Sequence, residues 1–323
     1  MLESFLQKFI TVSVCLAISS CQQLSFIDIP STNQNSRIDY LVIHATSESF
    51  EESLRLLSTP NSNPVSAHYL VPAPNDPSYL ENNLRVYRLV DENRRAWHAG
   101  MSNWGRESSL NDRSIGIEVV NDFECRNLEA RTEDDQGIQV ECQFPAYPES
   151  QIDLLIRLIA EILNRYREID PIDVVAHADI APSRKSDPGS EFPWKQLYES
   201  GIGAWYESDA VSKHLETIRG QQPSVSEVQC ALLIYGYPIE ITGRHDSQSQ
   251  FVMRAFQLHF RPGNYDGSID DESIAILFSL NEKYRADPND EQRSKCQTPS
   301  LLGSSGDTDY RGQTTFLGKF RIN

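Results

Sequence analysis

The segment V-V-A-H-A-D-I-A-P-S-R-K-S-D-P-G-S-E-F-P-W, residues 174–194, decides the architecture of this chain. It opens with an apolar run, Val174–Ala176, that predicts the end of a buried strand. Three prolines interrupt the residues that follow, so we expect a loop there and no helix. Polar groups gathered on a loop that leaves a rigid strand usually serve binding or chemistry. The loop carries four such groups, on His177, Asp179, Lys185 and Asp187.

A second strand supplies the partners that a metal site needs. His44 ends the β-rich run of residues 38–43, where it is well placed to meet His177 across the sheet. Asp187, ten residues beyond His177, could add an oxygen ligand. Two imidazoles and one carboxylate leave a fourth tetrahedral position for water, which is the arrangement of catalytic zinc sites. We therefore predict one Zn²⁺ per chain.

Two further residues fit hydrolytic chemistry at that metal. Glu118 stands among apolar strand residues, in the run of residues 114–120, and a buried acid there is costly unless it has a partner. Lys185 lies two residues before Asp187 and shares its loop. These positions make Glu118 the candidate general base and Lys185 the candidate cation for an oxyanion.

The rest of the chain alternates strand and helix signals before it becomes helical. Strands are expected at residues 38–43, 68–71, 85–90 and 114–120, and helices at residues 51–57 and 152–166. This alternation predicts an α/β domain, with a mixed central β-sheet flanked by helices. Three short apolar segments beyond Ser208 predict a small three-helix domain. The expected divisions are a signal peptide at 1–20, a tether at 21–36, a catalytic domain at 37–206, a helical domain at 207–286 and a partly flexible tail at 287–323.

The beginning of the chain predicts export. Residues 5–18 are mostly apolar and lead into Ser19-Ser20-Cys21, a pattern typical of a secretory signal and too short to span a bilayer. A Cys directly after small residues resembles the bacterial lipobox, in which Cys21 is lipidated, and Gln22 after it points to the outer membrane. We expect a monomeric outer membrane lipoprotein of a Gram-negative bacterium, facing the periplasm and attached to the membrane through Cys21. The alternative is a buried N-terminal helix with an incidental Cys.

The net charge indicates which binding partners suit this chain, and the cysteines indicate its cellular compartment. A net charge of −17 argues against nucleic acid and against anionic membrane surfaces as electrostatic partners. Four cysteines remain beyond the leader, and an even number in an oxidising compartment suggests two disulfides. The most local pairing joins Cys125 to Cys142 and Cys230 to Cys296, although the sequence alone leaves three connectivities open. The bridge between Cys125 and Cys142 would pin the acidic insert of residues 122–143 as a surface loop.

Five motifs in order resemble the zinc N-acetylmuramoyl-L-alanine amidases, the family of AmpD, the phage lysozyme-amidases and the peptidoglycan recognition proteins. With the lipobox and the second domain, the chain resembles an AmiD-like lipoprotein of this family. The motifs are Y-L-V-I-H-A-T (40–46), S-A-H-Y-L-V (66–71), A-W-H-A-G (96–100), S-I-G-I-E-V-V-N (114–121) and V-V-A-H-A-D-I-A-P-S-R-K-S-D-P-G (174–189). Residues 232–260 also resemble the peptidoglycan-binding helical domain, with Gly-Tyr, Gly, Asp and Ala-Phe-Gln in its order. A generic helical bundle is the alternative for that segment.

The resemblance implies hydrolysis of the amide between the lactyl group of N-acetylmuramic acid and L-alanine, in peptidoglycan or muropeptides. It implies His44, His177 and Asp187 as zinc ligands, Glu118 as the catalytic acid and base, and Lys185 as the oxyanion residue. Trp97 and His98 are expected to line the substrate groove.

Other interpretations use the same residues differently. The chain could be a receptor that binds muropeptides without cleaving them, or its zinc could be structural, which would require a fourth protein ligand. His68 and His98 are alternative ligands in principle, and His68 is expected to be a packing or hydrogen-bonding residue. Asp179 is expected to order its own loop, and Arg184 to be solvated.

Overall fold

The computed structural model describes residues 26–127, 140–286 and 296. The chain divides into two units, Met1–Asn35 and Ser36–Asn323. In the first unit, residues 26–35 form no helix or strand and are exposed. The expected signal peptide and Cys21 lie outside the described residues, as does most of the expected tail. In the described part of the chain, no helix combines the length and apolar character needed to cross a bilayer.

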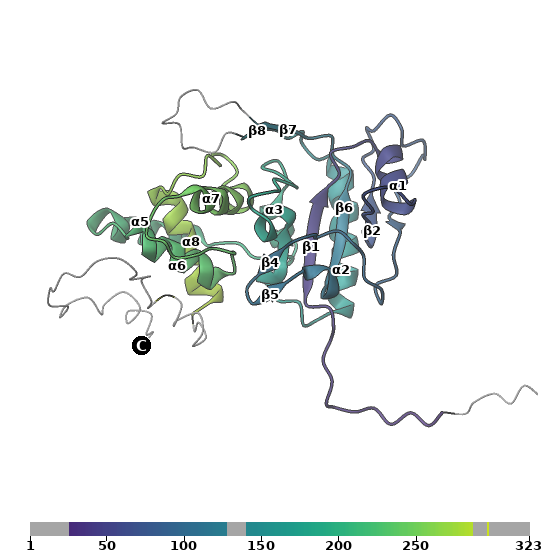
Figure 1. The fold of residues 1–323 in the computed structure, drawn as a ribbon, viewed down its shortest axis with the longest axis horizontal. Coiled ribbons are helices and arrows are strands. Elements are labelled where there is room, and N and C mark those ends of the chain that lie inside the picture. Colours follow the sequence, from purple (N-terminus) through teal and green to yellow (C-terminus); the bar gives the residue numbers. More distant parts are fainter. Residues whose placement is uncertain (1–25, 128–139, 287–295, 297–323) are drawn as a thin grey trace, which may run out of the picture. The chain divides into compact units, whose positions relative to one another are not determined.

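A five-stranded mixed sheet forms the centre of the second unit, in the order β3-β2-β6-β1-β9 (Figure 1). Neighbouring strands from β2 to β9 pair in parallel, and β3 is antiparallel to β2. Parallel strands are normally covered on both faces, which explains why β1 and β9 are apolar and almost wholly buried. The predicted mixed sheet is confirmed. Its strands are β1 (Tyr40–Ala45), β2 (Tyr69–Val71), β3 (Tyr87–Arg88), β6 (Ser114–Val119) and β9 (Val174–Ala176).

The two helices expected beside the sheet are present. Helix α1 (Phe50–Ser58) begins where the Ser49 side chain accepts a hydrogen bond from the backbone N–H of Glu52, as an N-cap residue does. Helix α2 (Glu149–Arg165) buries the predicted apolar stripe, with Ile152, Leu155, Ile159 and Ile162 in the main core. Short elements complete this region: β4 (Asn103–Trp104), β5 (Glu107–Ser108), η1 (Leu110–Asp112), η2 (Pro171–Asp173) and α4 (Trp194–Glu199).

One expectation about residues 174–194 is wrong. Residues His177–Ile180 form a helical turn, α3, directly after β9, where we expected a loop. The first proline comes only at Pro182, so one turn fits before it. The Asp179 carboxylate also accepts a hydrogen bond from the backbone N–H of Ala176, 2.8 Å away. This bond satisfies a donor at the start of the turn.

Both disulfides follow the most local pairing. Cys125 and Cys142 face each other in a hairpin of β7 (Glu124–Asn127) and β8 (Val140–Gln143) and are bonded. Cys230 is bonded to Cys296. The first bridge therefore closes the acidic insert at its base, and the second ties the described residue of the tail to the helical region.

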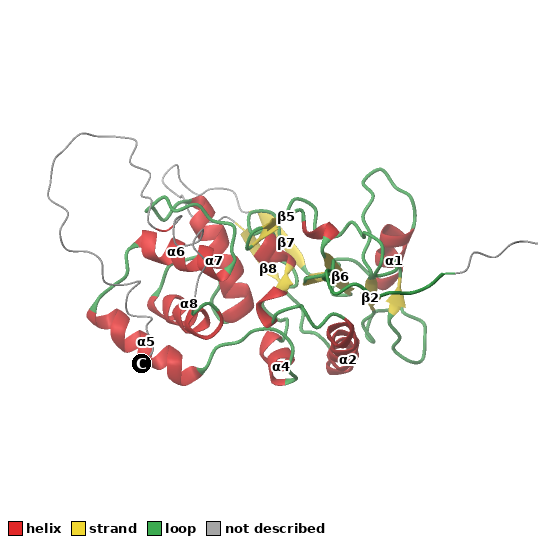
Figure 2. Cartoon of the chain, turned by 90° about the horizontal axis from the view of Figure 1, so that it is seen from below, coloured by secondary structure: helices red, strands yellow, loops and turns green. Residues whose placement is uncertain are grey.

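In the described part of the chain, four helices follow the sheet region, and Figure 2 shows them as red ribbons. The three that the sequence predicts are α6 (Val225–Tyr235), α7 (Ser247–Phe260) and α8 (Asp271–Tyr284), and α5 (Ser208–Gly220) precedes them. The sequence does not predict helix α5, because only Val211 and Ile218 on it are buried and two residues form no apolar stripe. The Gly-Tyr and Ala-Phe-Gln signature residues of this region serve the fold: Phe256 is fully buried, and Gln257 bonds the carbonyl of Ser268.

The helical region and the sheet region share one hydrophobic core. The indole of Trp104 lies against the rings of Tyr235 and Tyr237, with centroids 6.0 and 5.0 Å away. A Cβ at Gly236 would lie 2.8 Å from this indole, and the φ of +145° there also favours glycine. Helix α3 lies between the sheet and α7 (Figure 1). The two predicted domains are therefore packed together over a closely fitted aromatic contact.

A buried carboxylate fastens that contact. Asp179 on α3 is 0 % exposed. One of its oxygens accepts a hydrogen bond from the Tyr237 hydroxyl, at 2.6 Å, and the other lies 2.7 Å from Nδ1 of His259. Both partners belong to the helical region, 58 and 80 residues further along the chain. Asp179 therefore orders its own loop, as expected, and also joins α3 to the helical region.

This contact predicts unequal effects from two neighbouring tyrosines. Tyr237→Phe removes one donor from a buried carboxylate, so the free energy of unfolding should fall by about 1–3 kcal/mol. The matched control is Tyr235→Phe, because the Tyr235 hydroxyl makes no hydrogen bond found among the described residues, and this variant should change stability less. Urea unfolding of the full chain measures both. Equal losses would contradict the assigned role of the Tyr237 hydroxyl.

Candidate metal and catalytic site

The carboxyl ends of three parallel strands place the predicted site residues together. In the sheet register His44 on β1 pairs with Glu118 on β6, and Ile43 pairs with Ala176 on β9. His177 therefore leaves β9 beside His44. Ligand sites of open α/β sheets form at this edge, outside the carboxyl ends of the strands. The strand ends predicted from sequence are thus the ends that meet.

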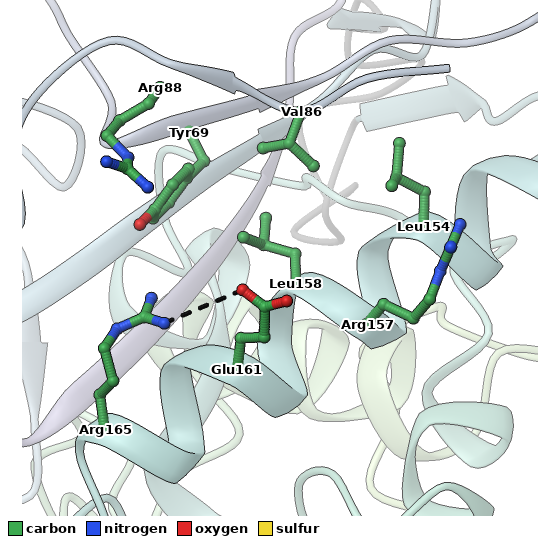
Figure 3. A pocket seen from close by; sticks show the side chains of 8 residues that line it. All are labelled: Tyr69, Val86, Arg88, Leu154, Arg157, Leu158, Glu161 and Arg165. Carbon is green, nitrogen blue, oxygen red and sulfur yellow. Dashed lines mark ion pairs between the residues drawn. The ribbon is translucent and has the colours of Figure 1, made fainter. Parts of the chain in front are cut away.

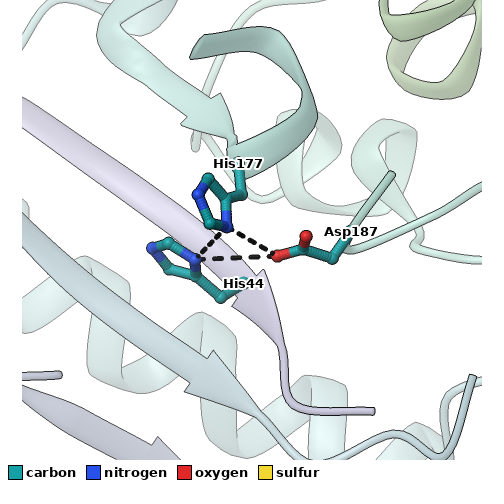
Figure 4. Close-up of side chains that lie close together, drawn as sticks. All are labelled: His44, His177 and Asp187. Carbon is teal, nitrogen blue, oxygen red and sulfur yellow. Dashed lines mark hydrogen bonds and ion pairs between the residues drawn. The ribbon is translucent and has the colours of Figure 1, made fainter. Parts of the chain in front are cut away.

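Three buried side chains converge there on one point (Figure 4). Nδ1 of His44 lies 2.9 Å from Nδ1 of His177, and Oδ2 of Asp187 lies 3.1 Å from Nδ1 of His177 and 3.6 Å from Nδ1 of His44. Ligands about 2.0–2.2 Å from a tetrahedral metal ion are about 3.3 Å from each other. The three atoms therefore fit a divalent metal ion, and each is 4 % exposed or less as a residue.

The ionisation of the three residues suits a metal. Burial, with the neighbouring His177, lowers the pKa of His44 to about 4. Burial opposes ionisation of Asp187, but the imidazoles of His177 and His44 outweigh it and hold the pKa of Asp187 well below its ordinary value. A neutral imidazole and an ionised carboxylate are the forms that bind metal ions. No fourth His, Cys, Asp or Glu joins this group within the described residues, so these residues supply three ligands, whereas structural zinc sites usually have four.

The loop that carries Asp187 is fixed from three sides. The backbone N–H of Ala178 donates to the carbonyl oxygen of Asp187, at 2.9 Å, and the N–H of Ala45 donates to its Oδ2, at 3.4 Å. The hydroxyl of Tyr147 donates to the carbonyl oxygen of Pro188, 2.8 Å away. Sequence reasoning missed Tyr147, which stands in a loop without periodicity, shortly before α2. These bonds hold the carboxylate in place without help from a metal.

Glu118 brings an uncommitted carboxyl oxygen to the site. Its Oε2 is shielded from solvent and has no hydrogen-bond partner among the described residues. Burial and the nearby Asp187 carboxylate raise the pKa of Glu118 to about 8, although the Lys185 ammonium acts in the opposite direction. A carboxyl group poised near neutrality beside a metal site can both accept and deliver a proton. Glu118 therefore has the position of a proton-transfer residue, and its raised pKa makes both its protonated and its ionised form accessible near neutral pH.

Lys185 and its neighbour Arg184 have different surroundings. The positive charge of Lys185 acts to lower the pKa of both Glu118 and His44. The Lys185 ammonium makes no hydrogen bond or ion pair within the described residues. Arg184, which we expected to be solvated, donates from Nη2 to the carbonyl oxygen of Met101, at 2.7 Å. Arg184 therefore ties the metal loop to the loop of residues 99–101, and Lys185 remains the cation available to a ligand.

The two residues predicted to line a groove differ sharply. Trp97 is 52 % exposed and is free to meet a ligand. His98 is buried, and its two ring nitrogens lie 3.0 Å from Nε2 of His44 and 3.1 Å from Oγ of Ser114. This places the His98 ring behind His44, on the side away from His177 and Asp187. His68, as expected, bonds backbone groups: its Nδ1 accepts from the N–H of Gly116, at 3.0 Å.

A separate pocket lies between α2 and the β2–β3 edge of the sheet (Figure 3). None of its lining residues belongs to the metal site. Its three arginines include Arg165, which pairs with Glu92 and with Glu161. The complete lining is Tyr69, Val86, Arg88, Leu154, Arg157, Leu158, Glu161 and Arg165. The pocket and the metal site are therefore distinct.

Two family models match the chain. Residues 34–190 match N-acetylmuramoyl-L-alanine amidase, and residues 221–277 match a peptidoglycan binding domain. The amidase AmiD of Escherichia coli is 42% identical over 252 residues, which are 78% of this chain and 85% of that protein.

Solved structures agree with this. The crystal structure of AmpDh3 from Pseudomonas aeruginosa is 43% identical, covers 81% of this chain and 100% of that chain, and has a TM-score of 0.72. The complex of E. coli AmiD with anhydro-N-acetylmuramic acid-L-Ala-D-gamma-Glu-L-Lys is 39% identical, covers 80% of this chain and 94% of that chain, and has a TM-score of 0.65.

The three converging ligands predict that the purified protein holds one divalent metal ion. Adding the metal back to chelator-treated protein should raise its melting temperature, because the ion binds only the folded site. His44→Ala should abolish that rise. His214→Ala is the control, because His214 bonds Glu282 in the helical region, and it should respond as the wild type does. Thermal denaturation with metal analysis measures both, and a normal response of His44→Ala would rule out this site.

Proposed function

The chain belongs to the N-acetylmuramoyl-L-alanine amidase family, and we propose that it hydrolyses the muramoyl-L-alanine amide bond with a zinc ion held by His44, His177 and Asp187. The observation that carries the proposal is the buried convergence of these three metal-binding atoms beside the unpartnered oxygen of Glu118. Two imidazoles, one carboxylate and an open position are the ligand set of catalytic zinc sites. An enzyme is preferred over a receptor because the ligands and both catalytic candidates are present together.

Glu118 moves the protons of this reaction. When bound, zinc supplies a Lewis acid for the lactyl carbonyl and lowers the pKa of a water molecule. The Glu118 carboxylate accepts the proton that the attacking water loses. It then delivers that proton to the nitrogen of the departing L-alanine, which leaves as an amine. A pKa raised towards neutrality favours both transfers.

Lys185 stabilises the negative charge that develops on the lactyl oxygen. Its ammonium lies near enough to influence Glu118 and His44. A fixed cation aimed at developing charge in a site that excludes water lowers the barrier without reorganisation. The exposed indole of Trp97, next to His98 in the sequence, would give an apolar face to the sugar or the lactyl group.

Muropeptides or peptidoglycan are the proposed substrates. Two solved structures of relatives contain ligands of this class: AmpDh3 with an anhydromuramic pentapeptide, and AmiD with an anhydromuramyl tripeptide. We extend that substrate class to this chain, and we propose that residues 221–277 bind the wall polymer. The fold supports joint action of the two regions, since the helical region is fastened to α3 and thereby to the site.

Glu118→Gln tests the mechanism because it keeps the shape of the side chain and removes its ability to take a proton. Release of stem peptide from purified muropeptides should fall by about 10²–10⁴-fold, while the zinc content stays at one per chain. Glu161→Gln, on the exposed side of α2, is the control and should cleave normally. A Glu118→Gln enzyme that still turns over would contradict the assigned role.

We also propose that the protein is an outer membrane lipoprotein that faces the periplasm. The support is the sequence around Cys21, with small residues before it and Gln22 after it. Expressed in a Gram-negative host, the chain should incorporate labelled palmitate and fractionate with the outer membrane. Cys21→Ser should lose the label and the membrane attachment. Label in the Cys21→Ser variant would argue against a lipid anchor at this residue.

A further inference from the structure

His44 is held from behind by a second buried histidine. Its Nδ1 faces the metal site, and its Nε2 lies 3.0 Å from Nδ1 of His98. The two rings stand edge to face, with centroids 5.0 Å apart. The other nitrogen of His98 lies 3.1 Å from Oγ of Ser114. A continuous line of polar atoms therefore runs from the metal site into the interior of the protein.

Ser114 determines which nitrogen donates and which accepts in these hydrogen bonds. Its hydroxyl donates to the carbonyl oxygen of Leu110, 2.7 Å away. A hydroxyl has one proton and can only accept from any further partner, so Nε2 of His98 must donate to Ser114. In a neutral His98, Nδ1 is then an acceptor, and it takes the proton of Nε2 of His44. Nδ1 of His44 is consequently left with a bare lone pair.

The protein is built around the His98 ring. A Cβ at Gly116 would lie 2.4 Å from Cγ of His98, so any larger residue would displace the ring. The side-chain oxygen of Asn111 accepts hydrogen bonds from the backbone N–H groups of His98 and Ala99, at 3.0 and 2.8 Å. His98 and Asn111 are each 7 % exposed. The ring is therefore fixed in place by both its backbone and its surroundings.

The other histidine of the metal site has no such support. Nε2 of His177 is buried and has no hydrogen-bond partner among the described residues. His177 is positioned instead by its place at the start of α3. The line of hydrogen bonds behind His44 is thus specific to one ligand.

We propose that His98 is a positioning residue for the metal site: it accepts the Nε2 proton of His44 and so keeps Nδ1 of His44 unprotonated and aimed at the zinc ion. The inference rests on the proposed function, because it takes His44 as a zinc ligand. The partner on the far nitrogen of a ligating histidine fixes its tautomer and its orientation. His98 performs this role with a neutral imidazole, where a carboxylate or a backbone carbonyl is the usual partner.

Two substitutions of nearly equal shape test the proposal. His98→Asn keeps an oxygen acceptor near the position of Nδ1, and His98→Leu removes it. The zinc affinity of the full chain, measured by competition with a chelator, should fall by about 10–100-fold in His98→Leu. His98→Asn should recover most of that loss. Unchanged affinity in His98→Leu, or equal losses in both folded variants, would overturn the proposal.

The tautomer can be observed directly in the wild-type protein. In metal-free protein labelled with ¹⁵N, the ring nitrogens of His44 should show the proton on Nε2, and His98→Leu should shift this population towards Nδ1. A wild-type His44 protonated on Nδ1 would refute the inference even if the protein binds zinc. A wild type that binds no zinc would instead refute the proposed function, so the two failures are distinguishable.

Discussion

The buried carboxylate of Asp179 is the constraint on which the arrangement of this molecule depends. It closes the first turn of α3 through the N–H of Ala176, and it accepts the hydroxyl of Tyr237 and faces His259 of the helical region. A buried carboxylate is costly unless its oxygens are satisfied. The sheet region alone would expose Asp179 with one protein donor, so the helical region completes the catalytic region. His177, the candidate ligand two residues away on the same turn, is held in place by the same bonds.

The metal site places groups of opposed acid–base character side by side. Burial acts on His44, Asp187 and Glu118 alike, yet the outcomes differ because the neighbours differ. Asp187 faces two imidazoles and stays ionised, whereas Glu118 faces a carboxylate and becomes a weaker acid. Such a separation of pKa values suits one carboxylate to bind a metal ion and the other to transfer protons. The difference in pKa between Asp187 and Glu118 follows from their positions, since both side chains are carboxylic acids.

The sequence predicted which residues come together better than it predicted the contacts that hold them there. His44 and His177 were identifiable because each follows an apolar run that had to end at the edge of a sheet, and Glu118 because a lone acid interrupts a strand. The contacts of His98 with His44 and Ser114 could not be predicted from the sequence, because they join a loop without periodicity to two strands. The partners of Asp179 lie in another region of the chain. Helix α5 was missed because it buries too few residues to form a stripe.

The supports that escaped prediction explain how three electron-rich atoms can be held together before a metal arrives. His44, His177 and Asp187 would otherwise turn their lone pairs away from one another or share protons. Each is instead fixed by bonds outside the site: His44 through His98, His177 through the turn that Asp179 closes, and Asp187 through the N–H groups of its loop and of Ala45. The bonds behind His44 and His177 use atoms other than the converging ring nitrogens. On Asp187, the Ala178 N–H binds the backbone carbonyl oxygen, and the Ala45 N–H makes a long contact with Oδ2, the converging oxygen itself. The site is therefore preorganised by the fold, so metal binding need not supply the free energy that orders it.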